Sequence, residues 1–597
     1  MTTLKQPENF NEHIHDENYG AKYNLQNLNH NTMIYVDGRP REQLNGVWNF
    51  TVDAYDFVLR EGWHILDRTD VHGNRLPWDF APDEGHDIVV PSCWNMVKPE
   101  YLYYEGSAWY SRWFTYFSEN SEERVFLRVG AANYDTKVFL NQKFLGNHYG
   151  GSTPFFVEFT GTLQEKNLLQ FCVNNDRTSD RVPMKNTDWF NYGGIYRDVE
   201  LIRVPKDFIV DFRIYLVPNG NFNEIAVAIT VSDETAQDEV SVRIPELGID
   251  QSLKLETGKI KGALNAEPEL WLPENPKLYD VEVSFREDRV SDRIGFRQIS
   301  VEGTKVLLNG KPIFLRGVSV HEDDRCVGKV SDKADILRRF QHAKELGCNF
   351  MRLAHYPHHE LAAKLADKVG LLLWEEVPVY WAIDFDKPAT YKDAENQLLE
   401  LIKRDFNRAS VIIWSVGNEN ADTDARLKFM SDLAQTAKQF DPSRLVSAAC
   451  LVNREKVKIE DRLAEVLDII GLNEYYGWYE PNYNDFIRLG ENSNPDKPVV
   501  ITETGAGALA GHHGPKTDMF TEEYMKNVYN KQIEVIRELD YVQGMSPWIL
   551  YDFRSPRRCN RFQKGFNRKG LIADNKHTKK LAFYVLQKFY QEKAEKQ

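Results

Sequence analysis

The chain has 597 residues, of which 89 are acidic and 74 are Lys or Arg, so its formal net charge is −15. This length predicts three to five domains and leaves ample chain for a large hydrophobic core. Hydrophobic residues make up 42% and charged residues 27%, the balance of a globular protein rather than a disordered one. An acidic protein is a poor general nucleic-acid binder, because that role needs a basic surface toward the phosphates.

The sequence also bears on location. It contains no run of about 18 apolar residues that would span a bilayer, and its polar start has no apolar signal segment. Its six cysteines are widely spaced without a CxxC pair, which indicates reduced, buried thiols. We therefore expect a cytoplasmic protein without a membrane partner, and leave a homo-oligomer open. Aromatic residues reach 12%, which suits either carbohydrate-binding surfaces or large sandwich cores.

The first half of the chain favours β-structure. Residues 1–30 are polar without sustained periodicity and are expected to form an N-terminal extension. Residues 31–204 contain short segments rich in β-branched and aromatic residues, such as Arg124–Val129, separated by Gly and Asn turns. Residues 205–301 repeat this style, for example in Ile225–Thr230. The pattern predicts a β-sandwich followed by a smaller, immunoglobulin-like β-sandwich.

Strands and helices alternate in residues 302–597, where the apolar run Ile313–Val320 precedes a helical stripe across Lys333–Leu346. The further predicted strands are Phe350–His355, Leu371–Val377, Val411–Glu419, Leu445–Cys450, Ile469–Tyr476, Val499–Gly505 and Met545–Phe553. The clearest further helices are His359–Val369, Tyr391–Asn407, Ala425–Phe440, Glu522–Leu539 and Lys580–Gln591. Eight such units match a C-terminal (β/α)8 TIM barrel. A doubly wound open sheet is the alternative, but no Gly-rich phosphate turn follows its first strand.

Polar residues end most of the predicted barrel strands. They are His321, His355, Glu375 with Glu376, Asn418 with Glu419, Asn473 with Glu474, and Glu503, while Trp548 and Asp552 lie on the eighth strand. Because the carboxyl ends of barrel strands form the functional face, these side chains are expected to meet at one rim. Six strands that deliver acids, amides and imidazoles to one place are hard to explain by packing alone.

Paired carboxylates at such a rim indicate glycosidic bond cleavage, in which one carboxyl group protonates the leaving oxygen and the other attacks the anomeric carbon. Glu419 and Glu503 follow strands four and seven, so they can face each other across the barrel mouth. A metal hydrolase is the rival hypothesis, based on the cluster His355, His358, His359, Glu375 and Glu376. However, HxxHH is not a recognised ligand spacing and HExxH is absent, so we expect no metal site.

Four segments in this order resemble the motifs of glycoside hydrolase family 2. They are Gly317–Asp324 (GVSVHEDD), Met351–Pro357 (MRLAHYP), Trp414–Glu419 (WSVGNE) and Ile501–Gly505 (ITETG). Val138–Gly146 and Asp188–Ile195 extend the resemblance to nearly the whole chain, from about Leu44 to about Phe589. It implies a jelly-roll-like sugar-binding sandwich over residues 31–204, ahead of the immunoglobulin-like sandwich and the barrel.

The resemblance assigns roles to individual residues. It implies Glu419 as the acid/base, Glu503 as the nucleophile, Asn418 as a ligand of the sugar 2-hydroxyl and Asp188 as a residue that reaches the active site. The further substrate-binding residues that it implies are His321, His355, Asn473, Tyr475, Tyr479 and Trp548. The chemistry agrees, because a nearby ionised Glu503 keeps Glu419 protonated for the first step. No cofactor is implied.

Within the family, Asn473–Tyr479 and Gly507–His512 resemble segments of β-glucuronidases, and Asn567-Arg568-Lys569-Gly570 matches their Asn-x-Lys motif for the sugar carboxylate. The C6 carboxylate of a uronic acid must meet a cation and hydrogen-bond donors once it leaves water. Lys569 and Asn567 supply these groups. By itself the motif would indicate only a basic turn, but its place after the eighth strand favours carboxylate binding.

The chain departs from the usual β-glucuronidase pattern at several positions. Glu474 stands where Arg is usual, and Thr504 stands where Tyr is usual. The usual Asn-Phe-Ala-Asp-Phe stretch is replaced by one that brings Arg554, Arg557 and Arg558 towards the rim. These arginines either hold a carboxylate in another orientation, bind an acidic neighbouring sugar or are surface charge.

Together these features predict a retaining exo-β-uronidase that releases terminal β-D-glucuronic acid from glucuronides or oligosaccharides by double displacement. The same machinery set for β-galacturonides is the first alternative, and a neutral β-galactosidase is a weaker one. A non-catalytic carbohydrate-binding protein is disfavoured, because a binder has no need of two opposed carboxylates.

Overall fold

The computed structural model describes residues 23–66, 72–74, 85–118, 120 and 122–596, which form two compact units. The first unit comprises residues up to Met33, Pro40–Asp176 and Asn191–Lys206. The second comprises Ile34–Arg39, Arg177–Phe190 and the chain from Asp207 onwards. Of the expected N-terminal extension, residues 1–22 lie outside the described residues, whereas the buried Tyr23 packs on Phe139 and Phe144 of the first unit.

The first unit is an antiparallel β-sandwich. In spatial order, its larger sheet contains β3 (His86–Val90), β2 (Gly46–Asp53), β4 (Ser107–Thr115), β10 (Lys166–Asn174), β7 (Asp135–Leu140) and β8 (Lys143–Tyr149). The smaller sheet contains β1 (Arg41–Gln43), β12 (Val199–Val204), β5 (Arg124–Val129) and β9 (Phe155–Glu158), while β6 (Ala132–Asn133) pairs with β11 (Gly194–Ile195) and α2 (Phe57–Arg60) is a single turn. Alternate residues face inward, so Leu127 and Val129 of β5 share a core with Leu169 and Phe171 of β10.

The second unit begins with a smaller sandwich. One sheet contains β13 (Ile209–Leu216), β14 (Glu224–Val231) and β17 (Lys259–Asn265), and the other contains β16 (Ile249–Lys254), β15 (Glu239–Ile244), β18 (Tyr279–Phe285) and β19 (Asp288–Ile294). Ile225, Val227 and Ile229 alternate into the core from β14 and meet Val281 and Val283 of β18. The strands β20 (Ile299–Glu302), β21 (Lys305–Leu308) and β22 (Lys311–Pro312) lead from this sandwich to the barrel.

The rest of the second unit is a parallel β-barrel. Its strands are β23 (Leu315–Arg316), β24 (Ser319–Val320), β25 (Phe350–Leu353), β26 (Leu372–Glu376), β27 (Val411–Asn418), β28 (Leu445–Leu451), β29 (Ile469–Asn473), β30 (Val499–Glu503) and β31 (Val542–Met545). The short strands β23 and β24 share the first position, because β23 pairs with β31 and β24 pairs with β25. This arrangement closes the sheet with eight strand positions, which confirms the predicted TIM barrel.

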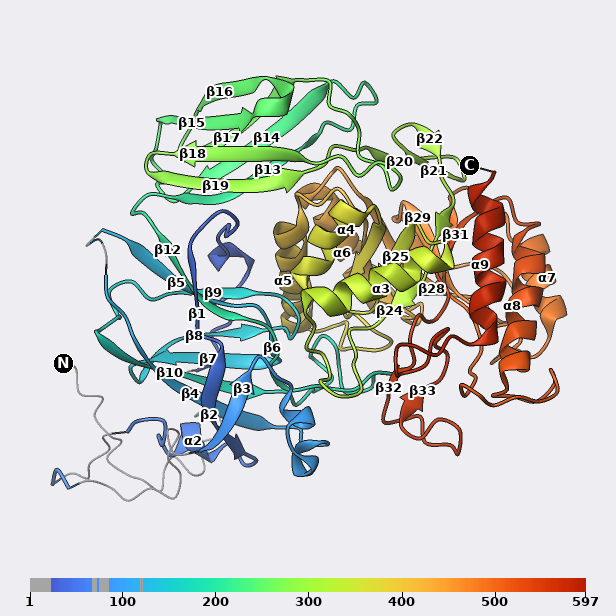
Figure 1. Ribbon diagram of the computed structural model, residues 1–597, viewed down its shortest axis with the longest axis horizontal. Coiled ribbons are helices and arrows are strands. Elements are labelled where there is room, and N and C mark those ends of the chain that lie inside the picture. Colours follow the sequence, from blue (N-terminus) through green and yellow to red (C-terminus); the bar gives the residue numbers. More distant parts are fainter. Residues whose placement is uncertain (1–22, 67–71, 75–84, 119, 121, 597) are drawn as a thin grey trace. The chain divides into compact units, whose positions relative to one another are not determined.

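Helices surround these strands (Figure 1). They are α3 (Lys333–Leu346), α4 (Glu360–Val369), α5 (Pro388–Asp405), α6 (Asp424–Phe440), α7 (Tyr483–Asn492), α8 (Glu522–Ile536) and α9 (Leu581–Ala594). Helix α7 was not among the clearest predicted helices, because it buries only Phe486 and Leu489. Between β28 and β29 the described chain forms only the 3-10 turn Arg462–Glu465.

The predicted eighth strand is present as β31, but its predicted bounds, Met545–Phe553, were wrong. Strand β31 ends at Met545, and the apolar residues after it lie at the barrel mouth. Pro547 has no N–H to donate to a neighbouring strand. The backbone after it still bonds to both sides, since Trp548 N donates to Thr504 O at 2.9 Å and Leu550 N donates to Ser319 O at 2.9 Å, while Ile549 N donates to Lys569 O at 3.2 Å. A Cβ atom at Gly570 would lie 2.1 Å from Asp552 N, so glycine permits this close approach.

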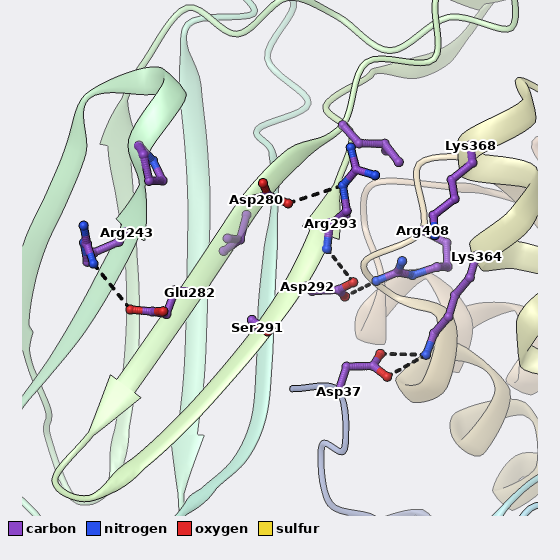
Figure 2. Close-up of a pocket in the computed structure, with 13 residues that line it drawn as sticks. Asp37, Arg243, Asp280, Glu282, Ser291, Asp292, Arg293, Lys364, Lys368 and Arg408 are labelled. Carbon is purple, nitrogen blue, oxygen red and sulfur yellow. Dashed lines mark hydrogen bonds and ion pairs between the residues drawn. The ribbon is translucent and has the colours of Figure 1, made fainter. Parts of the chain in front are cut away.

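Ion pairs line a hollow between the smaller sandwich and helix α4 (Figure 2). Lys364 contacts Asp37 at 2.7 Å, and Arg408 pairs with Asp292. The arginines of this hollow are thus already matched with carboxylates. We therefore attribute it to the packing of the second unit rather than to ligand binding.

All six cysteines are free, but only four are buried as expected. Cys326 and Cys559 are exposed, because both lie in turns between short elements rather than in strands or helices. No helix in the described ranges combines the length and the apolarity needed to cross a bilayer.

Candidate active site

The carboxyl ends of three barrel strands bring two glutamates together. Strand β27 ends at Asn418, and Glu419 follows it with a φ of +52°, a strained conformation that turns the chain at the strand end. Strand β30 ends at Glu503, which is the register partner of Asn473 on β29. All four side chains are buried or nearly so at the barrel mouth.

Glu419 has two hydrogen-bond donors. Trp381 Nε1 donates to Oε2 at 2.7 Å, and Asn473 Nδ2 donates to Oε1 at 3.1 Å. Burial and the neighbouring Glu503 carboxylate raise the pKa of Glu419 to about 7, although both donors act in the opposite direction. Glu419 can therefore hold or release a proton near neutral pH, as a general acid and base must.

Glu503 lies among hydrogen-bond donors and cationic side chains. Arg352 Nη1 donates to Oε1 at 2.9 Å, and the Tyr475 hydroxyl donates to Oε2 at 2.7 Å. His355 Nε2 lies 3.6 Å from Oε1. The site therefore contains two carboxyl groups, of which Glu419 has a raised pKa and Glu503 is fixed by an arginine and a tyrosine.

Arg352 connects the components of the site. Its fully buried guanidinium donates to Glu376 through Nε and Nη2, to Glu503 through Nη1 and to Asn418 Oδ1 through Nη2. Although burial opposes ionisation, Arg352 and His355 lower the pKa of Glu376 to about 2. Our sequence analysis assigned no role to Arg352 or Trp381. The available signal was a charged residue within the apolar strand Phe350–Leu353.

Asn418 has one donor available for a ligand. Its Oδ1 accepts from Arg352 Nη2 at 2.8 Å and from Asn473 Nδ2 at 3.1 Å. Its Nδ2 is buried and has no hydrogen-bond partner among the described residues. An unpaired buried donor is costly, so its position at the mouth fits a site that a polar ligand completes.

Aromatic side chains form the wall of the mouth. His355 stacks on Trp548 with ring centroids 4.8 Å apart, and Trp189 packs against His355 at 5.5 Å. His321 packs on Phe553 at 4.4 Å. Burial and the neighbouring His355 lower the pKa of His321 well below its usual value, so its imidazole is neutral at physiological pH.

A second cluster gathers two cations around one phenol oxygen. Lys569 Nζ donates to Tyr479 Oη at 2.8 Å, and Arg558 Nη1 donates to the same atom at 3.1 Å. Asp188 holds Arg558 in place, accepts from Asn567 Nδ2 at 3.2 Å and has its pKa lowered by Arg558 and Lys569 in spite of its burial. One carboxylate faces two cations here, so the cluster has a surplus positive charge.

We next compared the chain with models of known protein families. The model of glycosyl hydrolases family 2, sugar binding domain, matches residues 41–205, and that of the family 2 TIM barrel domain matches residues 299–594. A further family 2 model matches residues 207–297. The chain belongs to glycosyl hydrolase family 2. It is accordingly a glycoside hydrolase, and the predicted fold class of two β-sandwiches and a TIM barrel is confirmed.

Individual relatives cover almost the whole of this family 2 enzyme. A β-glucuronidase of Paenibacillus borealis is 29% identical over 595 residues, which span 91% of this chain and 96% of the relative. The structure of a β-glucuronidase from an uncultured Clostridium sp. has a TM-score of 0.81 at 26% identity, covering 94% of this chain and 99% of that one. The β-glucuronidase of Ruminococcus gnavus in complex with C6-substituted uronic isofagomine has a TM-score of 0.82 at 25% identity, covering 94% and 100%.

Some polar residues at the predicted rim of the family 2 barrel point away from the mouth. Glu474 accepts from Gln532 Nε2 of helix α8 at 3.0 Å, so this departure from the usual pattern lies behind the barrel wall. Burial and the neighbouring Asp405 raise the pKa of Glu375 well above its usual value, on the side of helix α5. Asp552 pairs with the buried Lys580 at 2.7 Å. Strands alternate their faces, so of two adjacent residues only one reaches the mouth.

The histidines of the rival metal hypothesis have separate partners. His355 Nδ1 contacts Glu376 Oε1 at 2.8 Å, and His358 Nε2 contacts Ala354 O at 2.9 Å. His359 caps helix α4 by accepting from Leu361 N at 3.1 Å. Within the described part of the chain, no three His, Cys, Asp or Glu residues are arranged to hold a metal ion.

Proposed function

We propose that this family 2 glycoside hydrolase is a retaining exo-β-glucuronidase. The observation that carries the proposal is the convergence of Lys569 and Arg558 on Tyr479, next to the carboxyl pair Glu419 and Glu503. A surplus positive charge beside a sugar-cleaving carboxyl pair is what a uronic acid requires, because its C6 carboxylate must be matched when it leaves water. The β-glucuronidase relatives support the same substrate class.

In the proposed mechanism, a Glu503 carboxylate oxygen attacks the anomeric carbon as the bond from that carbon to the leaving oxygen breaks. Glu419 gives its proton to the leaving oxygen. In the second step Glu419, now a carboxylate, takes a proton from water, whose oxygen attacks the same carbon and releases Glu503. Two inversions retain the configuration at the anomeric carbon.

The surrounding groups have defined places in this mechanism. Asn418 Nδ2 is free to donate to the sugar 2-hydroxyl, a bond that strengthens as positive charge develops at the anomeric carbon. Asn567 and Lys569 bind the C6 carboxylate, while Asp188 holds Arg558 and Asn567. The aromatic wall of Trp548, His355 and His321 faces the sugar ring, and Asn473, Tyr475 and Tyr479 complete the pocket.

The experiment that tests this proposal compares hydrolysis of p-nitrophenyl β-glucuronide, β-galacturonide and β-galactoside by the purified protein. These substrates share one leaving group and differ only in the sugar. We expect kcat/KM to be highest for the glucuronide. A higher value for the galacturonide would move the assignment to a β-galacturonidase, and a higher value for the galactoside would overturn the uronidase proposal.

The location of the protein is a separate proposal. We infer a cytoplasmic enzyme, because all six cysteines are free and two of them are exposed. Exposed thiols persist in a reducing compartment. Export of the protein in the producing cell, measured by fractionation, would contradict this inference.

A further inference from the structure

The segment Phe553–Ala573 is strongly basic within an acidic protein. It contains seven Lys or Arg residues and no acidic residue, whereas the whole chain has a net charge of −15. The segment forms a two-stranded hairpin of β32 (Phe553–Arg554) and β33 (Phe566–Asn567) and continues into the turn that carries Lys569. Figure 1 shows this hairpin, in red, as a loop beyond the ends of the barrel helices.

Only part of this positive charge is neutralised within the described chain. Arg558 pairs with Asp188, and Arg568 pairs with Asp552 and Asp574. The remaining five cations of the segment form no ion pair with any described residue; they are Arg554, Arg557, Arg561, Lys564 and Lys569. Arg557, Arg561 and Lys564 are also exposed. Unpaired cations on one loop of an acidic protein indicate a place that receives an anion.

Arg557 lies next to the proposed acid/base. Its guanidinium stacks over the Trp381 ring, 4.6 Å from the ring centroid, and Nη1 donates to Asn186 Oδ1 at 3.3 Å. Trp381 Nε1 in turn donates to Glu419 Oε2 at 2.7 Å. The Trp381 ring thus lies between Arg557 and Glu419, and the Arg557 guanidinium forms no ion pair with a described residue.

The two sides of the site therefore have different cations. Lys569 lies over the Tyr475 ring, 4.9 Å from its centroid, and the Tyr475 hydroxyl contacts Glu503. Lys569 thus belongs to the side of the proposed nucleophile, where the uronic acid itself binds. Arg557 belongs to the side of Glu419, which must protonate the leaving oxygen and so faces the leaving group.

We propose that the β32–β33 hairpin forms a leaving-group subsite for an anionic sugar, with Arg557 as its first contact and Arg561 and Lys564 beyond it. The natural substrates are then acidic oligosaccharides, in which the terminal glucuronic acid is linked to a sulfated sugar or to a second uronic acid. Both carry the same chemistry, an anionic oxygen group that a guanidinium binds. This inference rests on the proposed function, since it needs Glu419 to be the acid.

The test uses three β-glucuronosyl disaccharides that differ only in the second sugar: a neutral hexose, the same hexose with a sulfate group, and a hexuronic acid. For the Arg557→Gln variant we expect kcat/KM to fall about three- to tenfold on the anionic disaccharides and less than about twofold on the neutral one. Arg557→Lys keeps the charge and should retain part of the preference. Raising the ionic strength should also reduce the preference of the wild-type enzyme for the anionic disaccharides over the neutral one.

The matched control is Lys368→Gln, at the C-terminal end of helix α4 and the opposite end of the barrel. It removes one exposed positive charge that forms no ion pair with a described residue. It should leave all three rates unchanged. A larger effect of Arg557→Gln on either anionic disaccharide supports the subsite and identifies its anion. Equal losses on all three substrates, or none on any, would overturn it. If the wild-type enzyme cleaves the neutral disaccharide without any preference, only the subsite fails, whereas no cleavage of any glucuronide means that the proposed function fails.

Discussion

Arg352 illustrates how one buried charge organises this family 2 site. Its side chain has no exposed surface, and three of its contacts go to Glu376, Glu503 and Asn418. A guanidinium without water needs carboxylate and carbonyl partners to offset its desolvation. The same contacts orient the groups that we place around the sugar, so the position of the carboxyl pair depends on a residue with no chemical step of its own.

The proposed catalytic pair, Glu419 and Glu503, gives the first prediction. Glu503→Gln should abolish hydrolysis, because an amide cannot attack the anomeric carbon. Glu419→Ala should lose most activity on substrates with poor leaving groups, and azide should partly restore activity on an activated glucuronide. The measurement is the product configuration by NMR, which should be a β-glucuronosyl azide. An α-configured product would contradict the retaining mechanism.

The pKa of Glu419 gives the second prediction. Glu419 donates its proton only below its pKa of about 7, so kcat/KM for a poor leaving group should fall as the pH rises through about 7. Trp381→Phe removes a donor that favours the charged form and should therefore raise this pKa. We expect the alkaline limb to move up by about half to one pH unit, since a hydrogen bond contributes about 1 kcal/mol and one pKa unit is about 1.4 kcal/mol. A downward shift in the pH–rate profile would show that Glu419 is not the titrating acid.

The third prediction concerns the carboxylate-binding residues. Lys569→Ala leaves the C6 carboxylate without its cation, and such truncations cost about 2–5 kcal/mol, so kcat/KM on a uronide should fall at least about 30-fold. Asn567→Ala should act in the same direction but more weakly, because a neutral amide contributes less than an ammonium group. Parallel measurements with a neutral galactoside serve as the control. Equal losses on charged and neutral substrates would mean that this turn is only structural.

At the scale of elements, Glu474 connects strand β29 to helix α8. It accepts from Gln532 Nε2 at 3.0 Å and from Tyr476 N at 3.1 Å, and it is buried. Burial raises the pKa of Glu474 to about 7. The native state therefore binds this proton more tightly than the unfolded chain does. The resulting stability is fully present below the ordinary glutamate pKa and is lost as the pH rises through about 7.

The fourth prediction follows from this loss of stability at high pH. Glu474→Gln keeps a neutral side chain of the same size, so the variant does not lose stability at this position as the pH rises. The free energy of unfolding of the variant minus that of wild type should therefore increase by about 2–3 kcal/mol between pH 5 and pH 8. The measurement is urea titration at each pH. Glu534→Gln, on the exposed face of the same helix, is the control and should follow wild type. Parallel pH curves for wild type and Glu474→Gln would contradict the raised pKa.

At the scale of the whole molecule, the fifth prediction concerns metal ions. Every rim histidine has a protein partner, and the described residues contain no cluster suited to a metal ion. Dialysis against EDTA should therefore leave glucuronide hydrolysis unchanged, within the error of an initial-rate assay. Loss of activity that a divalent ion restores would revive the metal-hydrolase hypothesis.

The bounds of the three domains remain a prediction. Residues 31–204, 205–301 and 302–597 were separated by sequence pattern, whereas the compact units of the structure divide the chain otherwise. Ile34–Arg39 and Arg177–Phe190 associate with the second unit, although they lie within the predicted first sandwich. Sequence patterns report local periodicity, and these segments have contacts that local periodicity does not encode.

Local sequence patterns were enough to predict the fold class and to place the two glutamates at strand ends. Apolar alternation with period two and helical stripes with period 3.6 are local signals, so the sandwiches and the barrel follow from them. A parallel barrel then places the residue at each strand end on one rim, which located Glu419 and Glu503 without any coordinates.

Which rim residues share the site depends on register and on contacts between distant segments, and local patterns encode neither. Glu375 and Glu474 are neighbours of the last residues of β26 and β29, but they face the helices, because a single residue of register reverses the direction of a side chain. The backbone after Met545 also bonds to the turn of Lys569 through Ile549 N, a contact between distant segments that no local pattern predicts. Hydrogen bonds from Arg352 to Glu503 and from Trp381 to Glu419 likewise join residues far apart in the chain.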